Sequence, residues 1–120
     1  MPKVSVIIPN FNHDRFLPQR IQSILDQTFQ DFEIIFLDDC STDGSREVFS
    51  NYSSHPKISH AIFNEINSNS TFKQWNMGIS LALGKYIWIA ESDDYADPLF
   101  LEKLVPILEV NHNVGLAYSQ

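Results

Sequence analysis

Hydrophobic residues alternate between two spacings along this chain. Short runs rich in β-branched and aromatic residues, typical of buried strands, cover residues 4–8, 33–37, 58–63, 86–90 and 114–118. Between these runs, apolar residues recur every three or four positions, as on one face of a helix, over residues 14–27, 45–52, 71–83 and 98–108. The pattern predicts an α/β fold with a Rossmann-like, mostly parallel sheet and helices on both faces.

Prolines and capping residues predict where several elements begin and end. Pro9 should end the first strand. Pro18 is tolerated in the first turn of its helix, whereas Pro106 should kink the last helix. Asp97 is the expected N-cap of that last helix, with Pro98 at its first position.

Two segments in the middle of the chain lead to opposite expectations. The helix over 71–83 carries a stripe of apolar residues that we expect to face the core: Phe72, Trp75, Ile79 and Ala82. The polar segment before it, residues 64–70, lacks apolar periodicity. We expect that segment to form a mobile loop.

Composition narrows the possible classes of protein. The 120 residues are 43% hydrophobic and 12% aromatic, which is enough to bury the core of one domain. Fifteen acidic residues outnumber eight basic ones, giving a net charge of −7 and disfavouring a nucleic-acid partner. A single cysteine excludes a disulfide framework. The apolar runs are too short for a membrane span, and we expect the first ten residues to be a strand rather than a signal peptide.

Polar side chains gather where the predicted strands end. Residues 9–12 follow the first strand, residues 38–43 follow the second, and residues 91–94 follow the fourth. Ligands of open parallel sheets bind beyond the carboxyl ends of the strands. The sequence therefore places two acidic clusters, in 38–43 and 91–94, on the edge of the sheet where a ligand is expected.

The acidic clusters suggest a divalent cation. Neighbouring carboxylates repel one another, and a bound cation relieves that repulsion. Glu91, Asp93 and Asp94 offer hard oxygen ligands suited to magnesium or manganese, which also bind substrate phosphate. A second interpretation of the cluster stays open, because a Glu-x-Asp loop is often a solvated turn. We interpret Asp97, which follows the cluster closely, as a helix cap rather than a metal ligand.

Five segments occur in an order and spacing that match one protein family. They are Val4–Asn12 (VSVIIPNFN), Ser23–Phe29 with Phe32–Ile35, Asp38–Ser45 (DDCSTDGS), Asn76–Ile87 and Glu91–Asp94 (ESDD). The first resembles a Pro-x-Tyr/Phe-Asn strand end, the third an Asp-Asp-Gly-Ser-Thr-Asp-Gly-Ser loop, and the last an Asp-x-Asp-Asp metal motif. Together they resemble the nucleotide-sugar-binding half of an inverting family 2 glycosyltransferase of the GT-A fold.

The resemblance implies a UDP- or dTDP-sugar donor and a manganese or magnesium ion. Asp39 would accept a hydrogen bond from the ring N–H of the base, beside Pro9 and Phe11. Asp93 would hold the cation against the diphosphate, with Glu91 toward the ribose and the cation. The implied nucleotide-binding residues are Pro9, Asn10, Phe11, Asn12, Asp38, Asp39, Lys73, Glu91 and Ser92, and the implied metal ligands are Glu91, Asp93 and Asp94.

This chain departs from the family pattern at several positions. Cys40 replaces the usual glycine, and we interpret it as a small loop residue rather than a reactive thiol. Glu91 replaces aspartate, and residues 74–76 lack the common arginine. Lys73 is either a substitute charge on the phosphates or an exposed helix residue. We expect the scattered histidines to be surface or core residues rather than catalytic ones.

The resemblance also implies parts that residues 1–120 do not supply. Family members have a second half that binds the acceptor and provides an aspartate or glutamate as general base. We expect residues 1–120 to be the donor-binding half, with the base beyond residue 120, and to transfer sugar poorly or not at all. The implied acceptor is a saccharide or a lipid-linked molecule. The implied location is cytoplasmic, with peripheral association of the full-length protein at the inner face of the membrane.

Other functions compete with this one. A non-catalytic nucleotide-binding or interaction module of the same fold is the main alternative. A nucleotidyltransferase fits less well, because residues 10–15 are not a glycine-rich basic loop. A receiver domain needs an acidic pair after the first strand, where Pro9 and Asn10 stand. A dinucleotide oxidoreductase needs a Gly-x-Gly-x-x-Gly turn, which is missing there.

Overall fold

The computed structural model describes residues 1–110 and the backbone of residues 116–118. Its strands are β1 (Val4–Asn10), β2 (Phe32–Asp38), β3 (Ile58–Phe63), β4 (Tyr86–Ile89) and β5 (Leu116–Tyr118). Its helices are α1 (Leu17–Leu25), α2 (Ser45–Ser50), α3 (Thr71–Leu81) and α4 (Phe100–Val110). The predicted alternation is confirmed, although residues 114 and 115 of the last predicted strand lie outside the described part.

The strands form one sheet in the order β3-β2-β1-β4-β5, and all neighbouring pairs are parallel. From β1 the chain builds outward through β2 and β3, then returns to place β4 on the other side of β1. The order of strands therefore reverses between β1 and β4. In open α/β sheets a crevice forms at such a switch point, outside the carboxyl ends of the strands.

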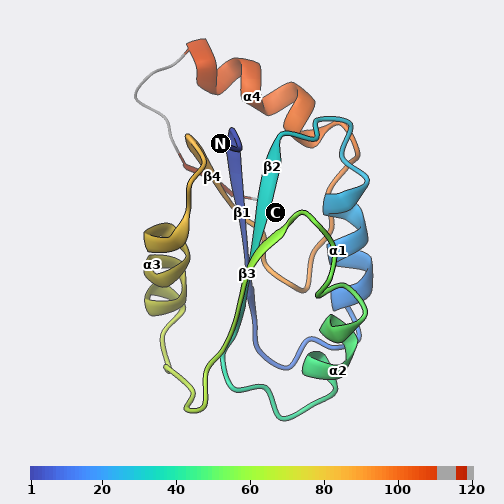
Figure 1. Ribbon diagram of the computed structural model, residues 1–120, viewed down its shortest axis with the longest axis vertical. Helices are drawn as coiled ribbons and strands as arrows, with labels where there is room; N and C mark the ends of the chain where they lie inside the picture. The colour runs from blue at the N-terminus through green and yellow to red at the C-terminus, as the bar shows by residue number, and fades with distance from the viewer. Residues whose placement is uncertain (111–115, 119–120) are drawn as a thin grey trace.

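Alternating side chains of the central strands point into two separate hydrophobic clusters, one on each face of the sheet. Val4, Val6 and Ile8 of β1 pack in a large cluster with apolar residues of α1, α2 and α4. Ile7 points to the opposite face, where a smaller cluster includes Trp75 of α3. Figure 1 shows α3 on one side of the sheet and α1 and α2 on the other. The prediction of helices on both faces is confirmed.

Pro9 does not end its strand as expected, whereas the kink expected at Pro106 stays a prediction. β1 continues through Pro9 to Asn10, because Pro9 lies beyond the last pair of β1 with β4, Ile7 with Ile89. Its missing N–H therefore costs no hydrogen bond between those strands. Helix α4 also continues through Pro106. Pro106 is exposed, as is Glu102 one turn earlier, so water can satisfy the carbonyl that proline leaves without an amide partner.

The predicted core-facing stripe of α3 is partly wrong. Phe72 is 72% exposed and Ile79 is 44% exposed, whereas the buried residues of this helix are Gln74 and Gly78. A β-carbon on Gly78 would come within 2.6 Å of the Ile7 side chain. The helix therefore approaches the sheet through its glycine, and hydrophobicity alone did not identify that face.

A buried carboxylate joins three strands of the sheet by hydrogen bonds. Glu33 of β2 accepts hydrogen bonds from Ser5 Oγ of β1 (2.5 Å), Ser59 Oγ of β3 (2.6 Å) and the Leu83 amide (2.7 Å). Burial by itself would raise the pKa of Glu33, but these hydrogen bonds outweigh burial and lower that pKa.

Among the described residues, no helix is long and apolar enough to cross a bilayer.

Candidate functional site

A pocket of about 710 Å³ opens at the carboxyl ends of β1 and β2, next to the point where the strand order reverses. One wall comes from the end of β1 and the turn after it, through Pro9, Asn10, Phe11 and His13. Glu91 adds a carboxylate from the segment after β4. Three of the predicted nucleotide-binding residues of this wall, and Glu91, are therefore brought together in one pocket.

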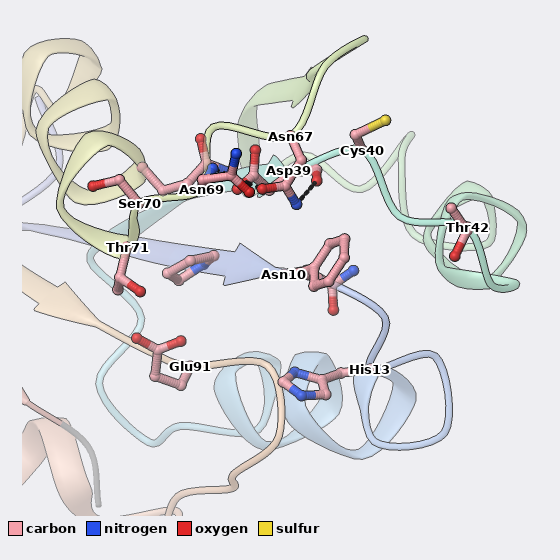
Figure 2. A pocket seen from close by; sticks show the side chains of 13 residues that line it. Asn10, His13, Asp39, Cys40, Thr42, Asn67, Asn69, Ser70, Thr71 and Glu91 are labelled. Atoms are coloured by element: carbon pink, nitrogen blue, oxygen red, sulfur yellow. Dashed lines mark hydrogen bonds between the residues drawn. The ribbon is translucent and has the colours of Figure 1, made fainter.

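The opposite wall comes from the loop after β2 and from the segment that leads into α3. Figure 2 shows Asp39, Asn67 and Asn69 on one side of β1, and His13 and Glu91 on the other. The remaining lining residues of this wall are Cys40, Thr42, Ser70, Thr71 and Gln74. The pocket therefore spans the end of β1 from one acidic residue to the other.

Asn10 is buried and only half satisfied. Its Nδ2 donates to Asp38 Oδ1 (2.8 Å) and to Ser41 Oγ (3.3 Å). Its Oδ1 has no hydrogen-bond partner among the described residues, although Asn10 is 2% exposed. A buried acceptor without a partner is costly, so this atom is a candidate to receive a hydrogen bond from a ligand or an ordered water.

Two of the predicted binding residues brace the loops instead of lining the pocket. Asp38 is buried, and its carboxylate accepts from Asn10, from the Ser41 amide (2.9 Å) and from Ser41 Oγ (2.6 Å). Asn12 has a φ of 56°, and its Oδ1 accepts from the Thr42 amide at 2.7 Å. Both residues therefore fix the turn after β1 against the loop after β2.

Asp39 anchors the segment that the sequence predicts to be a mobile loop. Its Oδ1 accepts from Asn64 Nδ2 (2.9 Å) and from the Ser68 amide (2.8 Å), while its Oδ2 accepts from Ser68 Oγ (2.8 Å). Asn67 Nδ2 also donates to the backbone carbonyl of Asp39 (2.9 Å). Hydrogen bonds to Asp39 therefore hold residues 64–70 in this structure, and the predicted mobility of the segment stays a prediction. One acceptor position on Asp39 Oδ2 is left for a further donor, since a carboxylate oxygen has two.

The start of α3 completes this wall. Ser70 is the N-cap and accepts from the Lys73 amide at 3.2 Å. Gln74 is buried, with its Oε1 accepting from Asn64 and its Nε2 donating to the Leu37 carbonyl at 3.4 Å. Lys73 is exposed and does not line the pocket.

The backbone conformation of Cys40 explains why the family pattern has glycine at this position. Its φ is 65°, in the left-handed region that favours glycine. Its Sγ donates to the Glu65 carbonyl at 3.3 Å, which adds a further tie to the 64–70 segment. The structure thus agrees with a role for Cys40 in the loop.

Glu91 is the half-buried carboxylate of the second acidic cluster. Its Oε1 accepts from Trp75 Nε1 at 3.3 Å. Burial raises the pKa of Glu91 and repulsion from Asp93 adds to the rise, while the Trp75 hydrogen bond opposes it. Asp93 is exposed, and neither Asp93 nor Asp94 lines the pocket. The structure therefore separates the three predicted metal ligands, with Glu91 inside the pocket and the other two beside it.

His13 and Ser92 join the two sides of the switch point. His13 Nδ1 lies 2.8 Å from Ser92 Oγ, and Ser92 is fully buried. Ser92 therefore does not line the pocket but holds a residue that does. The expectation that His13 is a surface or core residue missed its place in the pocket wall.

A buried cation lies close to the acidic cluster. Arg20 of α1 is fully buried, with its guanidinium 5.2 Å from the centre of the Trp88 ring. Its three guanidinium nitrogens have no hydrogen-bond partner among the described residues. Burial lowers the pKa of Arg20 to about 10, while the nearby charges of Asp94, Asp93 and Glu91 act in the opposite direction. The cluster is therefore partly balanced by a cation that sequence analysis did not identify.

The carboxylates suit a shared cation better than a closed protein cage. In the part of the chain that the structure describes, no group of three or more His, Cys, Asp or Glu side chains is arranged to hold a metal ion. Magnesium and manganese sites that use one or two carboxylates complete their coordination with water and substrate phosphate. Glu91 and Asp93 fit that kind of site by their chemistry.

The sequence pattern missed the wall built by the segment before α3. Asn67, Asn69, Ser70 and Thr71 lie between β3 and α3, and every strand-to-helix connection of such a sheet lies on the same edge. That rule, together with the Ser70 cap, is the signal that could have placed them. The same rule could have placed His13, which lies in the turn after β1.

Comparison with known families identifies the chain. The family model described as "Glycosyl transferase family 2" matches residues 5–119. This chain belongs to glycosyltransferase family 2. The family resemblance and the GT-A-type α/β fold predicted from the sequence are thereby confirmed.

Curated relatives of this glycosyltransferase-family chain are bacterial and longer. A putative teichuronic acid biosynthesis glycosyltransferase, TuaG, of Bacillus subtilis is 36% identical over 78% of this chain and 36% of its own length. The glycosyltransferase GlyG of Streptococcus pneumoniae is 37% identical over 84% of this chain and 33% of its own length. The chain thus spans about a third of the length of these relatives.

Solved structures agree with the fold. Staphylococcus aureus TarS, residues 1–349 in complex with UDP-GlcNAc, matches with a TM-score of 0.81 and 28% identity over 92% of this chain and 32% of TarS. A mannosyltransferase of Pyrobaculum calidifontis, in complex with GDP-Man and Mn2+, matches with a TM-score of 0.79 and 22% identity over 89% of this chain and 32% of its own. The second likeness supports the fold alone.

Proposed function

We propose that this chain is the donor-binding part of an inverting glycosyltransferase that uses a UDP- or dTDP-sugar in the synthesis of a cell-surface polysaccharide or glycoconjugate. The observation that carries the proposal is Asp39, which lines the pocket and keeps one acceptor position on Oδ2. Uracil and thymine present a ring N–H that a carboxylate accepts, whereas cytosine has no hydrogen at that position. A base without this donor would leave the buried carboxylate less well satisfied.

The neighbouring side chains support a nucleotide in this orientation. Phe11 is 45% exposed at the pocket wall and offers an aromatic face, with Pro9 beside it. Asn10 Oδ1 offers a free acceptor for a hydroxyl or an N–H of the ligand. TarS, which shares this fold at 28% identity, has been solved with UDP and with UDP-GlcNAc.

Glu91 and Asp93 are the residues that would hold a divalent cation. When bound, the cation supplies positive charge to the diphosphate as it leaves. Glu91 faces the pocket that would contain the diphosphate, so its charge needs a partner once the anion is there. The mannosyltransferase that shares the fold was solved in complex with GDP-Man and Mn2+.

The acceptor and the general base belong to the finer part of the proposal. We propose a saccharide or lipid-linked acceptor, a cytoplasmic location, and peripheral membrane association of the full-length protein. The relatives named for teichuronic acid and poly(ribitol-phosphate) chemistry support a cell-surface polymer. We also propose that the general base lies outside residues 1–120, so the 120-residue chain binds donor without efficient transfer. Rapid sugar transfer by this chain would contradict that proposal.

Calorimetric titration of the 120-residue chain with UDP and manganese tests the donor site. We expect Asp39→Ala and Asp93→Ala each to weaken UDP binding at least about tenfold, the effect of losing one hydrogen bond or charge contact. Asp31→Ala, at an exposed position before β2, is the matched control and should bind as the wild type does. Unchanged binding in both site variants would overturn the proposal.

A further inference from the structure

The pocket wall has carboxylates but no lysine or arginine among its described residues. Asp39 and Glu91 line it, whereas Lys73 is exposed and outside it. A nucleoside diphosphate is an anion, so these two carboxylates would repel its phosphates. Among the lining residues, His13 has the side chain whose N–H groups are best suited to an anionic oxygen.

The contact with Ser92 favours a hydrogen on the imidazole nitrogen that is left for the ligand. His13 Nδ1 lies 2.8 Å from Ser92 Oγ, and this is the hydrogen bond that the structure gives to both side chains. If the Ser92 hydroxyl donates to Nδ1, its own hydrogen is satisfied inside the protein, which matters because Ser92 is fully buried. Nε2 then carries the hydrogen of the neutral ring, and it also carries one in the imidazolium form.

The position of His13 fits the phosphate end of the proposed ligand. Figure 2 shows His13 and Glu91 across the end of β1 from Asp39. A nucleotide with its base at Asp39 that crosses the end of β1 would bring its diphosphate toward His13 and Glu91. Nε2 has no partner among the described residues, so it is available to a ligand in the pocket.

We infer that His13 is a binding residue for the diphosphate of the donor, giving its Nε2 hydrogen to a phosphate oxygen, and that Ser92 is the positioning residue that orients the ring. This inference rests on the proposed function, because it assumes a nucleoside diphosphate in the pocket. It adds a phosphate-binding residue that the sequence motifs did not assign. His13 also provides an N–H donor in a pocket wall that has no lysine or arginine among its described residues.

The test compares UDP with uridine, at one pH and with manganese, for the 120-residue chain and its variants. We expect His13→Phe to weaken UDP binding about 10- to 100-fold, the range for a hydrogen bond to a charged group, and to leave uridine binding unchanged. Ser92→Ala should weaken UDP binding less, about threefold to tenfold, again without an effect on uridine. His55→Phe, at a histidine outside the pocket, is the control and should leave both affinities unchanged.

Nitrogen-15 NMR of the wild-type imidazoles provides a readout that does not depend on the variants folding. UDP should shift the Nε2 resonance of His13, and uridine should not. Equal UDP affinity in His13→Phe and wild type, or equal weakening of UDP and uridine, would overturn the inference while leaving the proposed function in place. A wild-type chain that binds neither UDP nor uridine would overturn the proposed function and this inference together.

Discussion

Ser68 donates both its amide and its hydroxyl to the carboxylate of Asp39, each at 2.8 Å. The same carboxylate lines the proposed base pocket. Asp39 therefore has two roles, because its carboxylate holds the segment before α3 and offers a hydrogen-bond acceptor to the ligand. The two roles can be separated by changing Ser68 instead of Asp39.

Ser68→Ala should loosen residues 64–70 without abolishing nucleotide binding. The variant loses the contacts of the hydroxyl with Asp39 and with the Ser70 backbone but keeps the amide bond and the carboxylate, so we expect a loss of about 1–2 kcal/mol in unfolding free energy. Amide hydrogen exchange in residues 64–70 should become faster, and UDP affinity should stay within about threefold of wild type. A loss of UDP binding as large as that of Asp39→Ala would mean that the loop, and not the carboxylate, forms the base site.

Gly78→Ala should destabilise the fold although alanine is the better helix former. Alanine gains about 1 kcal/mol in helix propensity over glycine. Its β-carbon would meet the buried Ile7 side chain at 2.6 Å, and overpacking of this kind costs about 1–3 kcal/mol. Because Ile7 is fully buried and has little room to move, we expect a net loss in urea unfolding. Asn76→Ala, at an exposed position of the same helix, should not destabilise, and equal stability of Gly78→Ala and wild type would contradict the packing.

Cys40 gives a test of the loop conformation. A non-glycine residue at a φ of 65° is strained by about 1–2 kcal/mol, and a β-branched residue is worse. We expect Cys40→Gly to unfold within about 1 kcal/mol of wild type, since the relieved strain is offset by the greater freedom of the unfolded chain. Cys40→Val should lose about 1–2 kcal/mol or more. If valine were tolerated as well as glycine, the left-handed conformation would be wrong.

Glu33 predicts a dependence of stability on pH. Its folded pKa lies below the unfolded value of 4.5, so it contributes stability above about pH 4.5 that is lost as the pH falls through the folded pKa. Glu33→Gln should therefore cost about 1–3 kcal/mol near pH 7, and the gap to wild type should shrink at acidic pH. Urea unfolding between pH 3 and pH 7 measures this gap. Glu47→Gln, an exposed control, should show no such gap, and a gap for Glu33→Gln that is constant with pH would contradict the lowered pKa.

The alternation of strands and helices could be predicted because each element carries a clear apolar period. The face of α3 could be predicted only in part, because its fully buried residues are Gly78 and Gln74, neither of which has a large apolar side chain. The continuation of β1 through Pro9 could not be predicted either, because it depends on where β4 ends, which is a feature of the tertiary structure. Periodicity thus predicts elements well but not the close approaches between them.

The site was only partly predictable for a related reason. Pro9, Phe11, Asp39 and Glu91 follow strand ends and were expected in the pocket, as the structure has them. The partner that orients His13, Ser92, lies 79 positions away, and no local pattern contains that contact. Residues that act through long-range contacts therefore need the fold before their place can be known.

Thermal melting of the 120-residue chain with UDP, TDP, GDP and CDP, each with manganese and with a chelator, tests the central claim of a donor site most directly. Ligand at 100 times its dissociation constant adds about 2.7 kcal/mol, which raises the melting temperature by several degrees. We predict such a rise for UDP or TDP with manganese, a smaller one with chelator, and none for CDP, because cytosine lacks the ring N–H that Asp39 would accept. No shift with any nucleotide, or equal shifts with all four, would contradict a uracil- or thymine-specific donor site at Asp39.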